Sequence, residues 1–349
     1  MGLREYIIRR LLLLIPIMLG VVLLIFGVMQ FVDPLQRVTI YIRNPRQFSE
    51  TLMNTMIHAY GLDAPVYEQF YHWLLGMVQG NFGYSPTYRQ MVLPGLLARV
   101  PSTFELVLFC APVIIFVGIW LGVESAVRKD KPFDQLTRVI SILGTSLPSF
   151  FFGIVLSAIF IAQLRWVTAG RLTPNLSTAL SLMKNAGTWT EYTGLLTLDS
   201  LLNLRLDFFI DALEHLVLPV MVLVFIQTAV LVRVTRSSML ESLSKTYITA
   251  ARAKGLTNHE VIYKHARRNA LIPVVTISGL LVGGMMTGLI ITETVFLLPG
   301  IGSWAANAAQ SFDVSVVIIY ALFSAAVFVF ANLVVDVLYA YIDPRIRLG

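Results

Sequence analysis

The largest group of closely spaced charged residues in this 349-residue sequence lies in the segment 246–273, which reads TYITAARAKGLTNHEVIYKHARRNALIP. Its charges are mostly positive, and its residues favour helix on both sides of Gly255. A basic helical segment can bind an acidic surface or another protein, whereas general acid–base or nucleophilic catalysis needs a positioned base or an activated nucleophile. The segment is therefore predicted to be a contact surface rather than a catalytic site.

The rest of the sequence holds no pattern typical of catalysis or nucleotide binding. The phosphate-binding pattern GxxxxGK[ST] is absent, as are H-E-x-x-H and G-x-S-x-G. Five histidines are scattered without a neighbour at metal-ligand spacing: His58, His72, His215, His259 and His265. The single cysteine, Cys110, can form no intrachain disulfide and is expected to be a small buried apolar side chain. We expect no catalytic residue, no cofactor and no metal in this chain.

The overall composition is that of an integral membrane protein. Apolar residues make up 56% of the chain, charged residues 13%, and the mean hydropathy is +0.75. A soluble domain of this size would show amphipathic helices and strands, but here the apolar runs are unbroken and long enough to span a membrane. The net charge of +6 and the isoelectric point near 9.5 fit basic cytoplasmic loops, so no nucleic-acid partner is expected.

Six apolar runs predict six transmembrane helices in one transmembrane domain, residues 1–349. Each run has roughly 20 or more residues, enough to cross a hydrocarbon core of about 30 Å, and a helix satisfies its backbone polar groups internally. The expected spans are about 11–32, 103–127, 139–164, 212–234, 272–292 and 315–341. The fold class is therefore an all-α integral membrane protein.

The distribution of lysine and arginine predicts which side of the membrane each loop faces. Most of the 26 basic residues precede the first span, follow the second or fourth span, or follow the sixth. Because such residues are enriched on the cytoplasmic side, both termini and the loop 235–271 are expected in the cytoplasm. The regions 33–102 and 165–211 are then extracytoplasmic, and the first is long enough to hold short helices of its own.

Local signals divide the cytoplasmic segment into two helices. Met239, Leu243, Tyr247 and Ala251 are spaced by four, which predicts one amphipathic helix over Ser238–Lys254. Gly255 is expected to end this helix in the positive-φ conformation that glycine favours. Thr257-x-x-Glu260 forms a capping box that begins a second helix, and Pro273 is expected to end it before the next span. The turn would then lie farthest from that span.

Periodicity leaves two interpretations of this hairpin open: it lies on the membrane and binds anionic headgroups, or it binds a protein. The residues favour the second, because Thr249-Ala250-Ala251-x-x-x-Gly255, followed by Asn269 and Ile272-Pro273, resembles the EAA loop of ABC importer permeases. In that family the loop is a coupling helix that docks in a cleft of a separate ATPase, and Thr249 stands where the family has its namesake Glu. The resemblance implies these coupling residues: Thr249, Ala250, Ala251, Gly255, Leu256, Thr257, Asn258, His259, Asn269 and Pro273.

The whole chain resembles the first permease subunit of dipeptide and oligopeptide (peptide/nickel-type) importers. Eight motifs match that group in order: Ile8-Arg-Arg10 with Ile15-Pro16, Gly61-Leu-Asp-x-Pro65, Gly80-Asn-Phe-Gly-Tyr-Ser85, Arg99-x-Pro-Ser-Thr-Phe-Glu105, Ser146-Leu-Pro-Ser-Phe150, Arg252-Ala-Lys-Gly-Leu256, Glu293-Thr-x-Phe296 with Pro299-Gly-x-Gly302, and Asp343-Pro-Arg-Ile-Arg347. The resemblance implies the type I ABC importer transmembrane fold. The region 165–211 contributes no motif to this comparison.

The resemblance also implies a function and partners. It implies a permease in the cytoplasmic membrane that moves di- or oligopeptides by alternating access, or oligosaccharides, nickel or another solute with the same machinery. Two cytoplasmic ATPase domains would bind ATP and magnesium, and an extracytoplasmic solute-binding protein would deliver the cargo. Six spans are too few to enclose a solute path, so a second, similar permease subunit is expected beside the surrounding lipid. A channel or enzyme that acts alone is the distant alternative.

Several residues within or beside the spans are candidates for the transport path or its gate. Prolines inside a span kink it, hydroxyls satisfy freed carbonyls or face a polar conduit, and glycines allow close helix packing or a moving contact. A proline–glycine turn beside a glutamate is expected near the outer gate. The candidates are Ser146, Pro148, Ser149, Gly283, Gly284, Glu293, Pro299 and Gly300.

Overall fold

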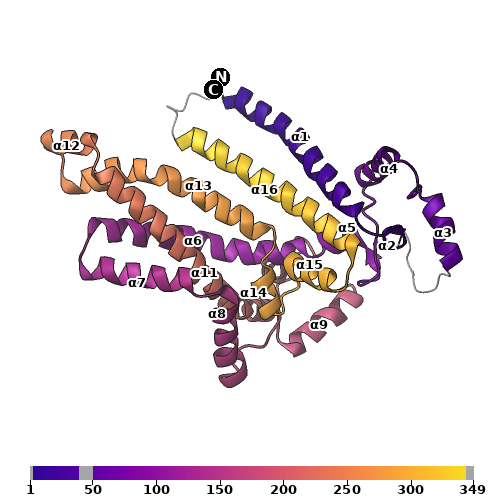
Figure 1. Ribbon diagram of the computed structural model, residues 1–349. Coiled ribbons are helices and arrows are strands. Elements are labelled where there is room, and N and C mark those ends of the chain that lie inside the picture. Colours follow the sequence, from indigo (N-terminus) through magenta and orange to yellow (C-terminus); the bar gives the residue numbers. More distant parts are fainter. Residues whose placement is uncertain (1–2, 39–49, 343–349) are drawn as a thin grey trace.

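The protein is a bundle of long helices with shorter helices gathered at one end (Figure 1). The computed structural model describes residues 3–38 and 50–342. The C-terminal motif predicted at Asp343–Arg347 lies outside these residues. Five long helices form the bundle: α1 (Leu3–Met29), α6 (Val100–Val127), α11 (Leu206–Leu243), α13 (Arg267–Met286) and α16 (Val314–Ile342). Each contains a stretch long and apolar enough to cross a membrane.

The predicted third span, 139–164, is not one helix. It comprises α7 (Pro132–Ser146) and α8 (Ser149–Leu156), and the latter continues as a π-helical segment, Ser157–Gln163. The two parts meet at an angle of 98°. The break falls at Leu147, whose φ of −77° and ψ of 125° are extended, because the ring of Pro148 disfavours helical geometry in the residue before it. Pro148 therefore breaks the span rather than only kinking it.

Two further helix boundaries differ from the prediction. The fourth span, expected at 212–234, extends at both ends as α11, so Arg236 lies in this helix and not in the loop expected at 235–271. The amphipathic helix expected over Ser238–Lys254 is interrupted, since α11 ends at Leu243 and α12 covers Thr246–Ala253. Pro219 lies inside α11 without ending it.

Glycines bring the long helices close together at two contacts. A Cβ at Gly118 of α6 would lie 2.7 Å from the side chain of Leu231 in α11, and one at Gly122 would lie 2.7 Å from Thr235. In α13, a Cβ at Gly279 or Gly283 would overlap Val335 or Ala331 of α16. Such small-residue contacts let helix backbones pack closely where lipid provides no hydrophobic driving force.

The short elements lie at the end of the bundle opposite α12 (Figure 1). They are α2 (Pro34–Val38), α3 (Glu50–Ala59), α4 (Val66–Val78), β1 (Tyr84–Ser85), β2 (Gln90–Met91), α5 (Val92–Leu97), α9 (Pro174–Asn185), α10 (Leu196–Leu202), α14 (Ile290–Val295) and α15 (Ile301–Gln310). The strands pair antiparallel, with Tyr84 opposite Met91. The first region, 33–102, thus holds the short helices that its length predicted. Helix α1 begins and α16 ends at the α12 end of the bundle.

Candidate functional site

The segment between α11 and α13 projects as a hairpin from one end of the molecule (Figure 1). We call residues 246–266 the α12 hairpin. Its turn is a Schellman motif, in which Gly255 has a φ of +79°. The Gly255 N–H donates to the carbonyl of Arg252 at 3.0 Å, and the Leu256 N–H donates to that of Ala251 at 3.4 Å. The prediction that Gly255 ends the helix with positive φ is confirmed, and only glycine adopts this φ without steric penalty.

The second limb of the hairpin begins with the predicted capping box. The Thr257 N–H donates to Glu260 Oε2 at 3.0 Å, while the Glu260 N–H donates to Thr257 Oγ1 at 3.3 Å. From Asn258 the chain stays helical to Met286, with a π-helical turn at Glu260–Ala266. Pro273 therefore lies inside α13 and does not end the second helix, contrary to the prediction. The hairpin is thus a direct extension of a membrane helix.

A small apolar core supports the hairpin. Its buried members come from both limbs and from the adjoining ends of α6, α11 and α13: Val123, Ala126, Met239, Ile248, Ala251, Val261, Ala266 and Ala270. Other predicted coupling residues form the outer surface of the hairpin. Thr249, Ala250, Asn258 and His259 are exposed, and Leu256 is half-buried. The hairpin therefore presents a preformed surface held from beneath.

Hydrogen bonds attach both limbs to the long helices. Ser242 of α11 donates its hydroxyl to the carbonyl of Ala266 at 2.8 Å and also contacts the Tyr247 hydroxyl at 2.5 Å. The Tyr263 hydroxyl donates to Glu124 of α6 at 2.5 Å. At the start of the hairpin, Lys245 lies 2.9 Å from Glu241, and this hydrogen bond raises the pKa of the ammonium group. A displacement of the hairpin would thus pull on α6 and α11 together.

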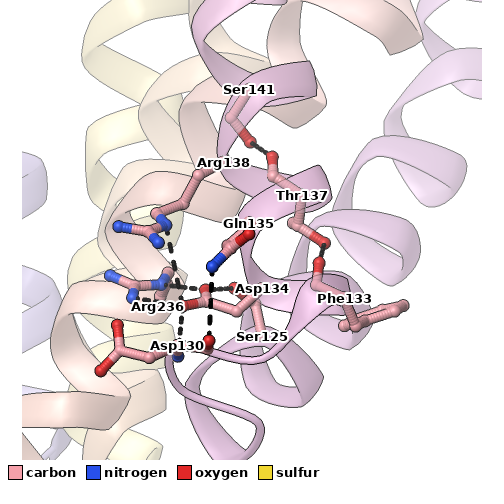
Figure 2. Close-up of polar contacts among 9 residues, drawn as sticks. All are labelled: Ser125, Asp130, Phe133, Asp134, Gln135, Thr137, Arg138, Ser141 and Arg236. Atoms are coloured by element: carbon pink, nitrogen blue, oxygen red, sulfur yellow. Dashed lines mark hydrogen bonds and ion pairs between the residues drawn. The ribbon is translucent and has the colours of Figure 1, made fainter.

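A buried ion pair lies farther from the α12 hairpin than these bonds, where α6, α7 and α11 meet (Figure 2). The carboxylate of Asp134, which is fully buried, accepts two hydrogen bonds from Arg236, from Nε at 2.6 Å and from Nη2 at 2.9 Å. It also accepts the Ser125 hydroxyl at 2.5 Å and the Asp130 N–H at 3.0 Å. Arg138 approaches the same carboxylate at 3.7 Å. This cluster fixes the end of α11 that carries the hairpin against the α6–α7 turn.

A second carboxylate cluster occupies the opposite end of the bundle. Glu293, 1% exposed, accepts the Thr103 hydroxyl at 2.7 Å, the Ser303 N–H at 2.8 Å and the Leu289 N–H at 3.3 Å. The glycine-rich turn is packed directly on the carboxylate, because a side chain at Gly300 would overlap it. Glu293 therefore connects the glycine-rich turn to the first helical turn of α6.

Glu105, two residues along α6 from Thr103, holds the segment 165–211 in the same way. It is 2% exposed and accepts both the N–H and the hydroxyl of Thr197 at 2.7 Å, and it pairs with Arg171. The Gly170 N–H donates to the carbonyl of Phe296 at 2.9 Å, which links this segment to the Glu293 turn. One turn of α6 thus joins two segments that are far apart in sequence.

The candidate path residues do not form one site. Ser146 and Pro148 are exposed at the α7–α8 break, and Ser149 is half-buried there. Gly283 packs against Ala331 of α16, so it serves helix packing, whereas Gly284 is exposed. Glu293 and Gly300 are buried against each other, and Pro299 lines a cleft of about 480 Å³ beside Arg171 and Trp189.

Four residues that hold these clusters were not predicted as site residues: Asp134, Arg236, Glu105 and Tyr263. Arg236 was counted only as a charge that determines topology, and Glu105 only as part of a motif. Their partners are far away in sequence, and Arg236 and Asp134 are 102 positions apart. The one available signal was Asp134 itself, an aspartate within a basic segment. Local sequence patterns do not indicate which arginine such an aspartate would pair with.

Comparison with known proteins gives one family and full-length relatives. The model of the family described as binding-protein-dependent transport system inner membrane component matches residues 114–348. The di/tripeptide transport system permease protein DppB of Pseudomonas aeruginosa (strain UCBPP-PA14) and the dipeptide transport system permease protein DppB of Escherichia coli (strain K12) are each 38% identical over 345 residues, 98% of both chains. The oligopeptide transport system permease protein AppB of Bacillus subtilis (strain 168) is 35% identical over 345 residues, 98% of this chain and 99% of its own.

Proposed function

Because this chain belongs to the family of binding-protein-dependent transport system inner membrane components, we propose that it is the permease subunit of an ABC importer that takes up di- and oligopeptides. Its relatives of matching length are named for dipeptide, di/tripeptide and oligopeptide transport. The same machinery with oligosaccharides, nickel or another solute as cargo is the alternative, because the resemblance places most of the specificity in the external binding protein.

The observation that carries the proposal is the preformed α12 hairpin. Its turn is closed by its own backbone bonds and capping box, its outer residues are exposed, and its base is bonded to α6 and α11. A surface that already has its bound shape loses little conformational entropy on docking. In the proposed complex, Thr249, Ala250 and the turn from Gly255 to His259 contact a separate ATPase, which holds ATP and magnesium. The α12 end then faces the cytoplasm, together with both termini.

The exposed apolar surface supports a second permease subunit. Helix α1 is buried over only 11% of its span, and α13, α16 and α6 line an apolar groove of about 570 Å³. Part of this surface would face lipid, and part would face a similar subunit related by an axis along the membrane normal. Alternating access would then be a relative movement of the two bundles. The opposite end, with its clefts and turns, would receive the solute-binding protein.

The experiment compares two glycines with the same geometry at opposite ends of the molecule. Gly187 follows α9 in a second Schellman motif, with a φ of +70°, and like Gly255 it has no atom within 4 Å of an added Cβ. Each is replaced by valine in the complete transporter reconstituted in liposomes. We expect Gly255→Val to lower peptide uptake per ATP hydrolysed by about tenfold, and Gly187→Val to leave this ratio unchanged.

The two variants carry the same local strain, so unequal ratios report the coupling role of the turn rather than the substitution itself. An unchanged ratio for Gly255→Val would contradict the proposed contact with the ATPase. Recovery of the chain from native membranes without an ATPase or a second permease would contradict the importer assignment as a whole.

A further inference from the structure

Arg233 is an exposed arginine inside a membrane helix. It lies in α11, and its guanidinium donates one hydrogen bond, from Nη2 to the hydroxyl of Thr145 at 2.7 Å. Within residues 3–38 and 50–342, no carboxylate lies at ion-pair distance from it. A guanidinium has five N–H donors, so one hydrogen bond leaves most of them unsatisfied by this chain.

The side chain points along α7 away from the charged α6–α7 turn. Thr145 is fourteen residues along α7 from Lys131, which at 1.5 Å per residue is about 20 Å from the charged α6–α7 turn. Arg236, one turn later in α11, extends the other way and pairs with Asp134 near the start of α7. Arginines near the ends of membrane helices normally extend toward the aqueous surface, so the direction of Arg233 is unusual.

Polar groups lie beside Arg233 among exposed apolar side chains. Helix α7 ends here, and of its last four carbonyls only that of Leu143 accepts a bond within the described residues, from the Leu147 N–H that follows the helix. Thr145 and Ser146 are exposed and Ser149 is half-buried at the break before α8. Exposed hydroxyls, free carbonyls and a cation at this depth are tolerated where they face a water-filled passage and not where they face lipid. The α7–α11 face at this level is therefore suited to line a water-filled passage.

We propose that Arg233 and the hydroxyls at the α7–α8 break form an anion-recognition site in the translocation path, and that it binds the terminal carboxylate of peptide cargo. The carboxylate part of this inference rests on the proposed function. An arginine can bind a carboxylate through two parallel hydrogen bonds, and every linear peptide has a terminal carboxylate whatever its side chains. The site would thus recognise peptides without reading their sequence.

The competing explanation is that Arg233 only stabilises the C-terminal end of the α7 dipole. Thiol labelling separates the two, because the single native cysteine, Cys110, is buried. Ser146→Cys in the assembled transporter is treated with membrane-impermeant thiosulfonates, one carrying a sulfonate and one carrying an ammonium group. We expect labelling by both, about tenfold faster with the anionic reagent, and loss of this preference when Arg233→Gln is added.

No labelling at residue 146, or the same preference with and without Arg233, would overturn the anion site. This result does not depend on any peptide, so it stands apart from the proposed function. The anion site would also be wrong if an acidic residue of a second permease subunit paired with Arg233. That residue would either exclude water, so that residue 146 is not labelled, or cancel the positive potential, so that the preference does not depend on Arg233.

The uptake experiment tests the ligand. A tripeptide with a free terminal carboxylate is compared with the same peptide as its terminal amide, each saturating the binding protein. We expect Arg233→Gln to lower uptake of the acid about tenfold and to leave the amide unchanged, with Arg233→Lys intermediate. The exposed Arg89 of the β1–β2 turn is the control, and Arg89→Gln should change neither.

An equal loss for acid and amide would show a structural role and overturn the carboxylate assignment. If the unmodified transporter took up neither peptide while residue 146 kept its charge-dependent labelling, the proposed function would fail and the anion site would remain.

Discussion

The two ends of the bundle hold their carboxylates with different mixtures of donors. At the end opposite α12, Glu293 and Glu105 accept bonds from the backbone N–H groups of Leu289, Ser303 and Thr197 as well as from side chains. At the α12 end, Asp134 and Glu124 are held mainly by the side chains of Arg236, Ser125, Tyr263 and Arg128. A backbone donor can be released only if its segment changes shape, whereas a side chain can exchange partners by changing rotamer. The difference indicates a fixed end and an adjustable one.

The first prediction tests the fixed end. Glu293→Ala removes the acceptor of two backbone N–H groups and one hydroxyl; the Ser303 N–H and the Thr103 hydroxyl are buried, and the Leu289 N–H is half-buried. At about 1–3 kcal/mol for each unsatisfied group, we expect the free energy of unfolding to fall by about 4 kcal/mol. Denaturant unfolding of the purified chain measures this loss. Glu241→Ala, at an exposed position of α11, is the control and should unfold as the unmodified chain does.

The second prediction tests the adjustable end. Asp134→Ala leaves the largely buried Arg236 without its carboxylate, and we expect a loss of about 3 kcal/mol in unfolding free energy. Unlike Glu293→Ala, it should also lower peptide uptake per ATP hydrolysed, because the α12 hairpin is no longer fixed to the α6–α7 turn. Adding Arg236→Met should restore part of the stability but not the ratio. Full recovery of both would show that the pair does not participate in coupling.

The third prediction concerns a single side-chain bond. Tyr263→Phe removes the hydroxyl that donates to Glu124 and should cost about 1 kcal/mol. We expect the uptake ratio to fall measurably while the unfolding midpoint moves by only the small amount that this loss implies. Tyr192→Phe, at an exposed tyrosine of the opposite end, is the matched control. If both substitutions lower the ratio equally, the two ends do not differ as described.

The smallest expected effect is at the turn itself. Thr257→Ala removes the capping hydroxyl and should destabilise the start of the second limb by about 1 kcal/mol. The loss should be local, so the midpoint of global unfolding should not change. Amide hydrogen exchange at Glu260 and Val261 should accelerate, while exchange at Ser303 should not. Faster exchange at both ends would contradict independent behaviour of the two regions.

Local chemistry predicted the α12 turn better than it predicted the spans around it. Gly255 and the Thr257–Glu260 capping box are defined by residues within a few positions of each other, and both are confirmed. The break at Leu147 had its own local signal in the following proline, but the apolar run on both sides favoured one span. Pro273 shows the reverse, since a proline inside α13 does not end the helix.

The long-range contacts could not be predicted from one sequence. The bond between Thr103 and Glu293 joins residues 190 positions apart, and that between Asp134 and Arg236 joins residues 102 apart. Periodicity and capping rules act within a few residues and contain no information on such pairs. The fold class and five of the six expected spans followed from hydropathy, because the bilayer imposes one length on every span.

The glycine contacts between α13 and α16 have a mechanical consequence. Where Gly279 and Gly283 meet Val335 and Ala331, the two helices pack too closely for an added Cβ, so a tilt of one helix would be transmitted to the other. Helix α13 has 20 residues and is about 30 Å long. A tilt of about 10° over that length displaces the far end by about 5 Å, close to the pitch of one helical turn. A substitution that opens this contact would let the two helices move separately and would shorten the displacement that one transmits to the other.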